Sequence, residues 1–300
     1  CCMRIGGAGE GGHTNIQQYW RIPVGSLEEN MDEEEAASLL EERLTQAVRR
    51  RLVADVPVGT FLSGGIDSTT VSAMAAGLYP NINAFTLGYE DTSPDMEEVP
   101  QAVATAKMYT MKHTIHRVFP DETLQYLNEM IAGYEEPFYG LAPNYIISKK
   151  VKDSGITVIL NGLGGDELFA GYRRYTLIST WKRIRHFALL GRWLGPWLGH
   201  RGRMLQRLSL ADTPDRLHTC LFAKFNDTEL KSLFNMERIK ELNLIEKIHS
   251  MYAKGEKYVD EIEAMSMMDI RNYISNHHLH RVDQFGMAHS IEARFPFLDH

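Results

Sequence analysis

Six consecutive residues, Ser63-Gly64-Gly65-Ile66-Asp67-Ser68, have the types and the spacing to hold a phosphate group. Glycines let the backbone turn sharply and approach a ligand closely. The free N–H groups at the start of a helix and the hydroxyls of the two serines are donors that suit a polyanion. Asp67 would repel a bare phosphate, so its presence predicts a bridging Mg²⁺. The segment lacks the Gly-Lys-Ser/Thr ending of the ATPase phosphate loop, and its plainer interpretation is a tight strand–turn–helix corner.

The segments around this loop predict how it is positioned. The apolar run Val56–Leu62 comes directly before it and predicts a buried strand, and residues 67–77 predict a helix after it. A second glycine-rich loop, Asn161–Glu167, follows another apolar run, Ile156–Leu160. Because ligands of open parallel sheets bind at the carboxyl ends of strands, both loops are candidate binding segments.

The chain alternates between strands and helices up to about residue 168. Beyond the two strands already named, the predicted elements are strands at Ile82–Leu87 and Thr114–Val118 and helices at Asp32–Val53, Glu97–Tyr109, Asp121–Gly133 and Pro143–Ser154. This alternation predicts an α/β fold with a doubly wound parallel sheet. After Leu168 only helices are predicted, at Tyr175–Leu190, Pro214–Phe222, Ile239–Tyr252 and Glu261–Leu279. The predicted units are a polar, glycine-rich segment at 1–30 that is a linker or the tail of a preceding domain, an α/β domain at 31–174 and a helical extension at 175–300.

The composition of the 300 residues excludes several classes of protein. Apolar residues make up 44% and charged residues 24%, which is ordinary for a soluble globular chain. A net charge of −7 argues against a nucleic-acid coat protein, so no nucleic-acid partner is expected. Three cysteines give no disulfide framework and predict a reducing compartment, the cytoplasm. Without an apolar run of about 18 residues, no membrane span is expected.

Four ordered motifs resemble those of one protein family. The segment Val56–Ser68, VPVGTFLSGGIDS, looks like the pyrophosphate loop of the ATP pyrophosphatase (PP-loop) superfamily. More narrowly, it is similar to the synthetase domain of glutamine-hydrolysing asparagine synthetases. Phe85–Gly88 resembles the adenine-contacting strand of that family, Asn161–Tyr172 its second substrate loop and Ser290–Asp299 its late motif. The resemblance runs from about residue 18 to residue 300 and implies an adenine nucleotide alpha-hydrolase-like fold.

The resemblance also implies an activity, the ATP-dependent amidation of a carboxylate with ATP and Mg²⁺ bound. The substrate carboxylate attacks the α-phosphate of ATP to give an acyl-adenylate and pyrophosphate, and ammonia then displaces AMP. Ammonia would come from a glutaminase domain before Cys1, because we expect the sequence to be a piece of a longer chain. Cys1 could be the nucleophile of such a glutaminase domain, or it could simply be the position at which the sequence was cut. The first interpretation is disfavoured, because the loop at Ser63 begins too soon after Cys1 to leave room for a glutaminase domain between them. A homodimer is a further expectation.

The resemblance assigns site roles residue by residue. Asp67 and Asp166 would hold Mg²⁺ on the pyrophosphate and are counted as catalytic. Glu292 and Arg294 are the other catalytic candidates, although a buried pair that pins a loop is an equal interpretation. The residues expected to bind the nucleotide are Leu62, Ser63, Gly64, Gly65, Asp67, Ser68, Leu87 and Gly162.

A few positions depart from the family pattern. Leu163 stands where the family commonly has a glutamate that is thought to take part in the chemistry. Asn276-His277-His278 lie where acids are frequent, Gln284 lies where arginine is frequent, and the catalytic lysine is expected beyond His300. The resemblance implies aspartate as the default acceptor, and Leu163 motivates the alternative of another carboxylate such as a sugar acid. A non-catalytic nucleotide-binding module and a tRNA-modifying relative are the rival interpretations.

Charged and histidine residues outside these motifs have plainer interpretations. His113 and His116 are expected to be structural, and the acids of 95–98 are expected to be the solvated start of a helix. The segment Leu168–Ala211 has no acid and nine basic residues. It is interpreted as a solvated helical face near an ATP site, with a membrane-surface segment or a docking face as alternatives.

Overall fold

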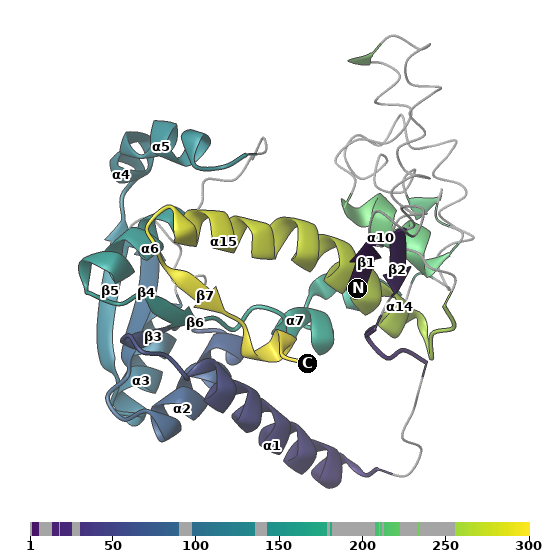
Figure 1. Cartoon of the computed structure of the whole chain (residues 1–300), viewed down its shortest axis with the longest axis horizontal. Helices are drawn as coiled ribbons and strands as arrows, with labels where there is room; N and C mark the ends of the chain where they lie inside the picture. Colours follow the sequence, from purple (N-terminus) through teal and green to yellow (C-terminus); the bar gives the residue numbers. More distant parts are fainter. Residues whose placement is uncertain are drawn as a thin grey trace.

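The computed structural model describes residues 2–5, 14–17, 19–25, 31–89, 98–135, 143–178 and 256–300, with shorter stretches at 181, 208–209, 211, 213–222 and 233–234. Its centre is a five-stranded sheet in the order β5-β4-β3-β6-β7, in which every neighbouring pair is parallel (Figure 1). The strands are β3 (Val58–Phe61), β4 (Asn83–Tyr89), β5 (Lys112–Val118), β6 (Val158–Leu160) and β7 (Glu292–Arg294). The predicted α/β fold with a parallel sheet is confirmed.

Alternation of side chains along the strands gives this sheet two apolar faces. On β6, Val158 and Leu160 pack toward α1 and α2, whereas Ile159 packs toward α6 on the opposite face. The helices on the first face are α1 (Glu33–Arg51), α2 (Ile66–Leu78) and α3 (Val99–Met108), and those on the second are α6 (Pro143–Asp153) and α15 (Leu279–Met287) (Figure 1). Burial on both faces explains why the central strand β6 is a continuous apolar run, whereas the outer strand β5, which is largely exposed, has the polar sequence KHTIHRV.

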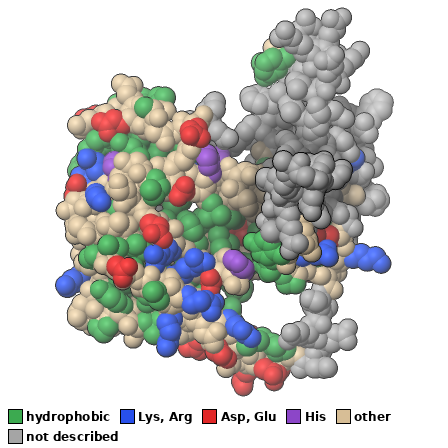
Figure 2. Space-filling view, in the orientation of Figure 1, with side chains coloured by type: hydrophobic (Ala, Val, Ile, Leu, Met, Phe, Trp, Pro, Cys, Tyr) green, Lys and Arg blue, Asp and Glu red, His purple; other side chains and the backbone are tan. Residues whose placement is uncertain are grey.

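Helix α1 has charges that match its dipole. Its N-cap Asp32 accepts the backbone N–H of Glu35 at 2.8 Å, and acids fill the first turn while Arg49, Arg50 and Arg51 occupy the last. The space-filling view shows basic side chains over the C-terminal half of this helix and acidic ones at its start (Figure 2). The predicted helix at 32–53 is confirmed, with its end at Arg51.

The C-terminal part of the chain contains one long helical run. Helix α14 (Glu261–Met268) continues into the π-helix η3 (Asp269–His278) and then into α15. Helix α10 (Pro214–Phe222) packs against α14. The predicted helix at 261–279 is therefore confirmed and extends to Met287. Its middle is widened, a feature that is frequent at functional positions.

Three parts of the structure differ from the sequence predictions. Strand β7 lies where only helices were predicted, because three residues are too few to show a period of two and β7 depends on its pairing with β6. The predicted helix at 121–133 is two short helices, α4 (Pro120–Gln125) and α5 (Leu127–Ala132). An antiparallel pair, β1 (Cys2–Ile5) and β2 (Thr14–Gln17), was not predicted and lies within the segment expected to be a linker or the tail of a preceding domain.

Some sequence predictions lie outside the described residues. They are the helix at 239–252, most of the helix at 175–190 and most of the acid-free basic segment. Among the described helices, none combines the length and the apolar character that crossing a membrane requires.

Candidate functional site

The order of the strands creates a switch point between β3 and β6. From β3 the chain runs outward through β4 to β5, and it then returns to β6 on the other side of β3. The loop Ser63–Ser68 follows β3, and the loop Asn161–Glu167 follows β6. Ligands of open α/β sheets bind in the crevice at such a point. The fold therefore brings the two glycine-rich loops to one edge of the sheet.

The loop after β3 is held by its own hydroxyl groups. The Ser63 and Ser68 hydroxyls lie 2.7 Å apart, and Ser68 Oγ accepts the backbone N–H of Ser63 at 3.0 Å. Ser63 Oγ accepts the N–H of Gly65 at 3.1 Å. Gly65 is the N-cap of α2, and no side chain of the described residues caps that helix. The first-turn N–H groups of α2 are therefore left to a ligand.

A chain of hydrogen bonds supports the loop from beneath. The Thr86 hydroxyl donates to the carbonyl oxygen of Leu62 at 2.5 Å and lies 2.7 Å from His113 Nε2. Burial lowers the pKa of His113, which favours the neutral ring. His113 thus holds Thr86, which holds the end of β3. The other predicted structural histidine, His116, pairs with Glu122 at 2.8 Å.

Two glycines let the second loop lie directly against the first turn of α2. A Cβ on Gly162 would lie 2.6 Å from the backbone nitrogen of Ser68 and 2.8 Å from the carbonyl carbon of Asp67. A Cβ on Gly165 would overlap the carboxylate of Asp67. Only glycine fits at these two positions without a shift of the backbone or of Asp67. The two loops therefore form one wall of the site.

Asp67 and Asp166 meet where the loops touch. The backbone N–H of Asp166 hydrogen bonds to the Asp67 carboxylate, and the pKa of Asp67 is raised by burial and then by the charge of Asp166. Burial also raises the pKa of Asp166, and the guanidinium of Arg174 opposes that rise. Two carboxylates that each disfavour the charge of the other have an electrostatic reason to share a cation.

A cavity of about 710 Å³ lies in front of both loops. Its described lining includes three carboxylates, those of Asp67, Glu98 and Asp166, and no lysine or arginine. A polyphosphate would meet net repulsion there unless a cation accompanied it. Mg²⁺ typically binds through one or two carboxylates together with phosphate oxygens and water. Asp67 and Asp166 fit such an ion, whereas the described residues contain no cluster of three or more ligands that could hold a metal alone.

Glu98 is a cavity residue that the sequence analysis interpreted as the solvated start of a helix. Its carboxylate accepts the backbone N–H of Gly64 at 3.3 Å, and a Cβ on Gly64 would lie 2.7 Å from the Glu98 carbonyl oxygen. The start of α3 thus packs against the loop Ser63–Ser68. Asp95 and Glu97 lie outside the described residues.

Several predicted nucleotide-binding residues do not line the cavity. Leu62 is 1% exposed and packs in the core with Ala84 and Ala102, so only its backbone borders the loop. Leu87 packs against the cluster on the α6 face, and the N–H of Gly64 is directed to Glu98. Of the predicted nucleotide-binding set, the cavity is lined by Ser63, Gly65, Asp67, Ser68 and Gly162, and it is also lined by Asp166, which was predicted to hold the metal.

Glu292 and Arg294 also lie away from the cavity lining. Arg294 donates to Glu292 at 2.8 Å and to the carbonyl oxygens of Arg51 and Val53 at 2.8 and 2.7 Å. The first carbonyl belongs to the last residue of helix α1, and the second belongs to the turn that follows the helix. Of the two interpretations left open, the contacts of Arg294 match a pair that pins a loop, but the pair is not buried as that interpretation expected, because the Glu292 side chain is 58% exposed.

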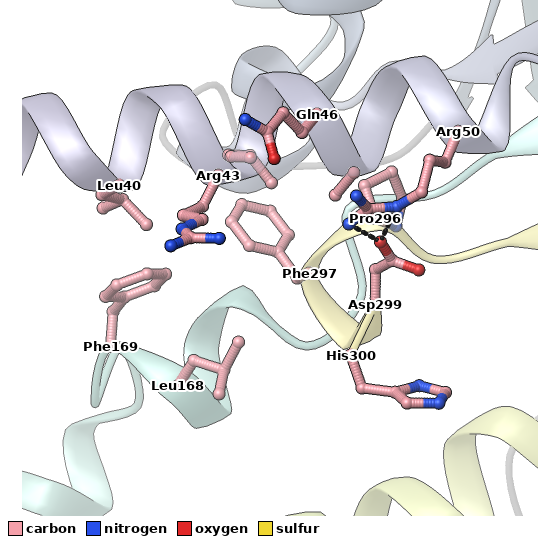
Figure 3. Close-up of a pocket in the computed structure, with 12 residues that line it drawn as sticks. Leu40, Arg43, Gln46, Arg50, Leu168, Phe169, Pro296, Phe297, Asp299 and His300 are labelled. Carbon is pink, nitrogen blue, oxygen red and sulfur yellow. Dashed lines mark hydrogen bonds and ion pairs between the residues drawn. The ribbon is translucent and has the colours of Figure 1, made fainter.

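An apolar wall that the sequence analysis missed completes the site. Leu40, Leu44, Phe169 and Phe297 line the main cavity and also a smaller one of about 350 Å³ beside it. In the close-up, Phe297 lies beneath α1, and Asp299 is paired with Arg50 at the end of that helix (Figure 3). These residues come from three distant segments. Leu40 and Leu44 lie one turn apart on α1, but no spacing in the sequence relates them to Phe169 or Phe297.

Comparison with known proteins identifies relatives of this chain. The sequence model of a family described as asparagine synthase matches residues 39–300. The glutamine-hydrolysing asparagine synthetase 1 of Bacillus subtilis is 27% identical over 304 residues, which cover 96% of this chain and 46% of that protein. Asparagine synthetase B of Escherichia coli is 32% identical over 151 residues, which cover 44% of this chain and 26% of that protein.

Comparison with solved structures also gives a similar protein. The NH3-dependent NAD synthetase of Campylobacter jejuni has a TM-score of 0.33 and 14% identity, and the match covers 77% of this chain and all of that one. The chain spans less than half the length of the asparagine synthetases that it matches.

Proposed function

Because the chain belongs to the asparagine synthase family, we propose that it is the synthetase part of an ATP-dependent ligase that converts a carboxylate into an amide. One observation carries this proposal. Asp67 and Asp166 meet in front of an uncapped helix start, in a cavity whose described lining has carboxylates but no basic residue. Such a site suits a polyphosphate that arrives with a divalent cation.

The proposed reaction has two displacements. The acceptor carboxylate oxygen forms a bond to the α-phosphorus of ATP, and the bond between that phosphorus and the bridging oxygen breaks, which releases pyrophosphate. The nitrogen of ammonia then forms a bond to the acyl carbon, AMP leaves with the former carboxylate oxygen, and ammonia loses a proton to solvent. The serine hydroxyls and the N–H groups at the start of α2 orient the pyrophosphate. Asp67 and Asp166 would hold Mg²⁺, which when bound neutralises charge on the phosphates.

Aspartate is the acceptor that we propose first, because the curated relatives that match are asparagine synthetases. Ammonia would come from glutamine hydrolysed by a separate glutaminase domain of the same protein. Leu163 gives no acid–base group to the second loop; its N–H donates to Asn161 Oδ1 at 2.9 Å. Proton transfer therefore has to rely on other groups or on water.

Exchange of labelled pyrophosphate into ATP tests adenylation directly. We expect exchange that requires both Mg²⁺ and the acceptor carboxylate, with aspartate as the active acceptor. Exchange with another carboxylate but not with aspartate would move the proposal to that acceptor. Nucleotide binding without exchange for any carboxylate would favour a non-catalytic nucleotide-binding module.

A further inference from the structure

Two neighbouring acids on helix α7 (Gly165–Leu168) lie in opposite environments. Asp166 lines the cavity, whereas Glu167 is completely buried. Successive residues of a helix project about 100° apart, so the direction of one acid fixes that of the other. A helix of four residues has a single turn and no stability of its own. Contacts from elsewhere must therefore determine where Asp166 lies.

Glu167 receives such contacts from two segments. The Tyr172 hydroxyl donates to Glu167 Oε1 at 2.7 Å, and the Ser266 hydroxyl of α14 donates to the carbonyl oxygen of Glu167, also at 2.7 Å. Gly171 N–H donates to the carbonyl oxygen of Asp166 at 2.9 Å, and a Cβ on Gly171 would overlap the Asp166 carboxylate. The turn after α7 is thus wrapped closely around Asp166.

Asp269, the first residue of the π-helix, lies at the centre of the surrounding contacts. It is fully buried, and its Oδ2 accepts the Tyr175 hydroxyl at 2.6 Å and the guanidinium of Arg174 at 2.8 Å. Its Oδ1 lies 2.6 Å from His218 Nε2 of α10. One carboxylate therefore joins three segments that are far apart in the sequence.

Arg174 connects this carboxylate to the site. Its guanidinium lies 3.6 Å from the centre of the Tyr172 ring, and Tyr172 in turn holds Glu167. Its charge also acts on Asp166. The Tyr175 hydroxyl, bound to Asp269, lies 3.5 Å from the carbonyl oxygen of Glu167. Both routes from Asp269 thus end on α7.

We propose that Asp269 is a positioning residue of the nucleotide site, which acts through Arg174, Tyr172 and Tyr175 to hold α7 with Asp166 facing the cavity. The inference rests on the proposed function for the role of Asp166. It goes further because it gives the helical extension a role in positioning the cation site. Asp269 itself is not among the described residues that line the cavity, and its described contacts do not include the loop Ser63–Ser68. Outer partners that orient metal-binding groups commonly change metal affinity when they are removed.

The test is the Mg²⁺ requirement of nucleotide binding in the intact protein. Calorimetric titration with ATP at a series of Mg²⁺ concentrations gives the concentration of Mg²⁺ at half-saturation without any turnover. In Asp269→Asn we expect that concentration to rise about 10-fold or more. Tyr175→Phe removes one hydroxyl while keeping the ion pair of Asp269 with Arg174, and it should shift the value in the same direction by less. This milder variant decides the matter if Asp269→Asn does not fold.

Glu256→Gln is the matched control. Glu256 also accepts from one arginine and one tyrosine, Arg271 at 2.6 Å and Tyr258 at 3.4 Å, next to the same helical run. The hydrogen bonds that the structure describes for Glu256 do not involve α7, so its loss should lower thermal stability without changing the Mg²⁺ requirement. A folded Tyr175→Phe or Asp269→Asn with the wild-type Mg²⁺ requirement would overturn the inference.

Hydrogen exchange separates this inference from the proposed function. The amides of Leu168, Phe169 and Gly171 close the turn by bonding to Gly164, Gly165 and Asp166. They should exchange several-fold faster in Asp269→Asn than in Glu256→Gln, with no nucleotide present. Equal exchange in the two variants would overturn the positioning role. Wild-type protein that binds no nucleotide, with faster exchange in Asp269→Asn, would instead overturn the proposed function and leave Asp269 as an anchor of α7.

Discussion

At the scale of the residue, Asp67 combines a cost to the folded state with a role in binding. Its pKa is raised by burial and by Asp166, so the folded protein holds a proton on this group more tightly than the unfolded chain does. The destabilising contribution is therefore complete above the raised pKa and disappears as the pH falls through it. The negative charge of Asp67 is thus needed to bind a cation, but it destabilises the protein when no cation is bound.

The variant Asp67→Asn should separate these two effects. We expect a higher melting temperature than wild type at pH 7, because a repelling charge is gone, and no gain at a pH below the ordinary pKa of an aspartate, where the group is protonated in both the folded and the unfolded state. Binding of ATP with Mg²⁺ should weaken by at least about 10-fold. Thermal unfolding at both pH values and calorimetric titration measure the two quantities. A lower melting temperature at pH 7 would contradict the assigned repulsion.

The variant Gly162→Ala tests the close approach of the two loops. The new methyl group would press on the backbone of Ser68 and Asp67, and overpacking of this kind costs about 1–3 kcal/mol. We expect both stability and nucleotide affinity to fall. The control is Gly77→Ala in the same α2, where a Cβ meets no atom within 4 Å and should stabilise by about 0.5–1 kcal/mol. Equal nucleotide affinity in the two variants would show that the two loops can move apart without weakening nucleotide binding.

At the scale of the element, Arg294 joins strand β7 to the end of helix α1. Its contacts with the carbonyl oxygens of Arg51 and Val53 predict a structural effect in Arg294→Gln. We expect a loss of about 1–3 kcal/mol in stability, because acceptors are left without a donor, and unchanged KM values for ATP and the acceptor. Urea unfolding and steady-state kinetics measure these effects. A normal stability with a raised KM for the acceptor would restore the role in substrate contact.

Local patterns explain which elements could be predicted from the sequence. Strand β3, the loop Ser63–Ser68 and helix α2 follow one another, so apolar run, glycines and helix signal lie within 25 residues. Strand β7 has three residues and exists because β6 pairs with it, which no local pattern records. The helix predicted at 261–279 is confirmed, but its extension to Met287 and its π-helical middle were not predicted.

The residues of the site also differ in whether a local sequence pattern marks them. The loop residues Asp67 and Asp166 could be predicted because each sits beside glycines at the end of a strand. Asp269 could not, because Arg174 and His218 lie 95 and 51 positions away and the carboxylate has no glycine or motif beside it. The apolar wall of Leu40, Phe169 and Phe297 was missed for the same reason.

At the scale of the whole molecule, ligand binding should stabilise the fold only when the cation is present. The site lies at the junction of both loops, so a ligand that bridges them favours the folded state. At a free concentration of 100 times Kd, MgATP should add about 2.7 kcal/mol to the free energy of unfolding. ATP with EDTA should add far less, because the described cavity lining supplies no basic side chain. Equal stabilisation with and without Mg²⁺ would contradict the cation requirement.

The late position of β7 in the chain also has a consequence for synthesis on the ribosome. Its partner β6 ends at Leu160, whereas β7 begins only at Glu292. A nascent chain therefore has β3, β4, β5 and β6 available long before the last strand emerges. During that interval one edge of β6 has open backbone donors and acceptors, and an unpaired edge of this kind invites aggregation. We therefore expect the growing chain to depend on chaperones that shield that edge until translation passes Arg294.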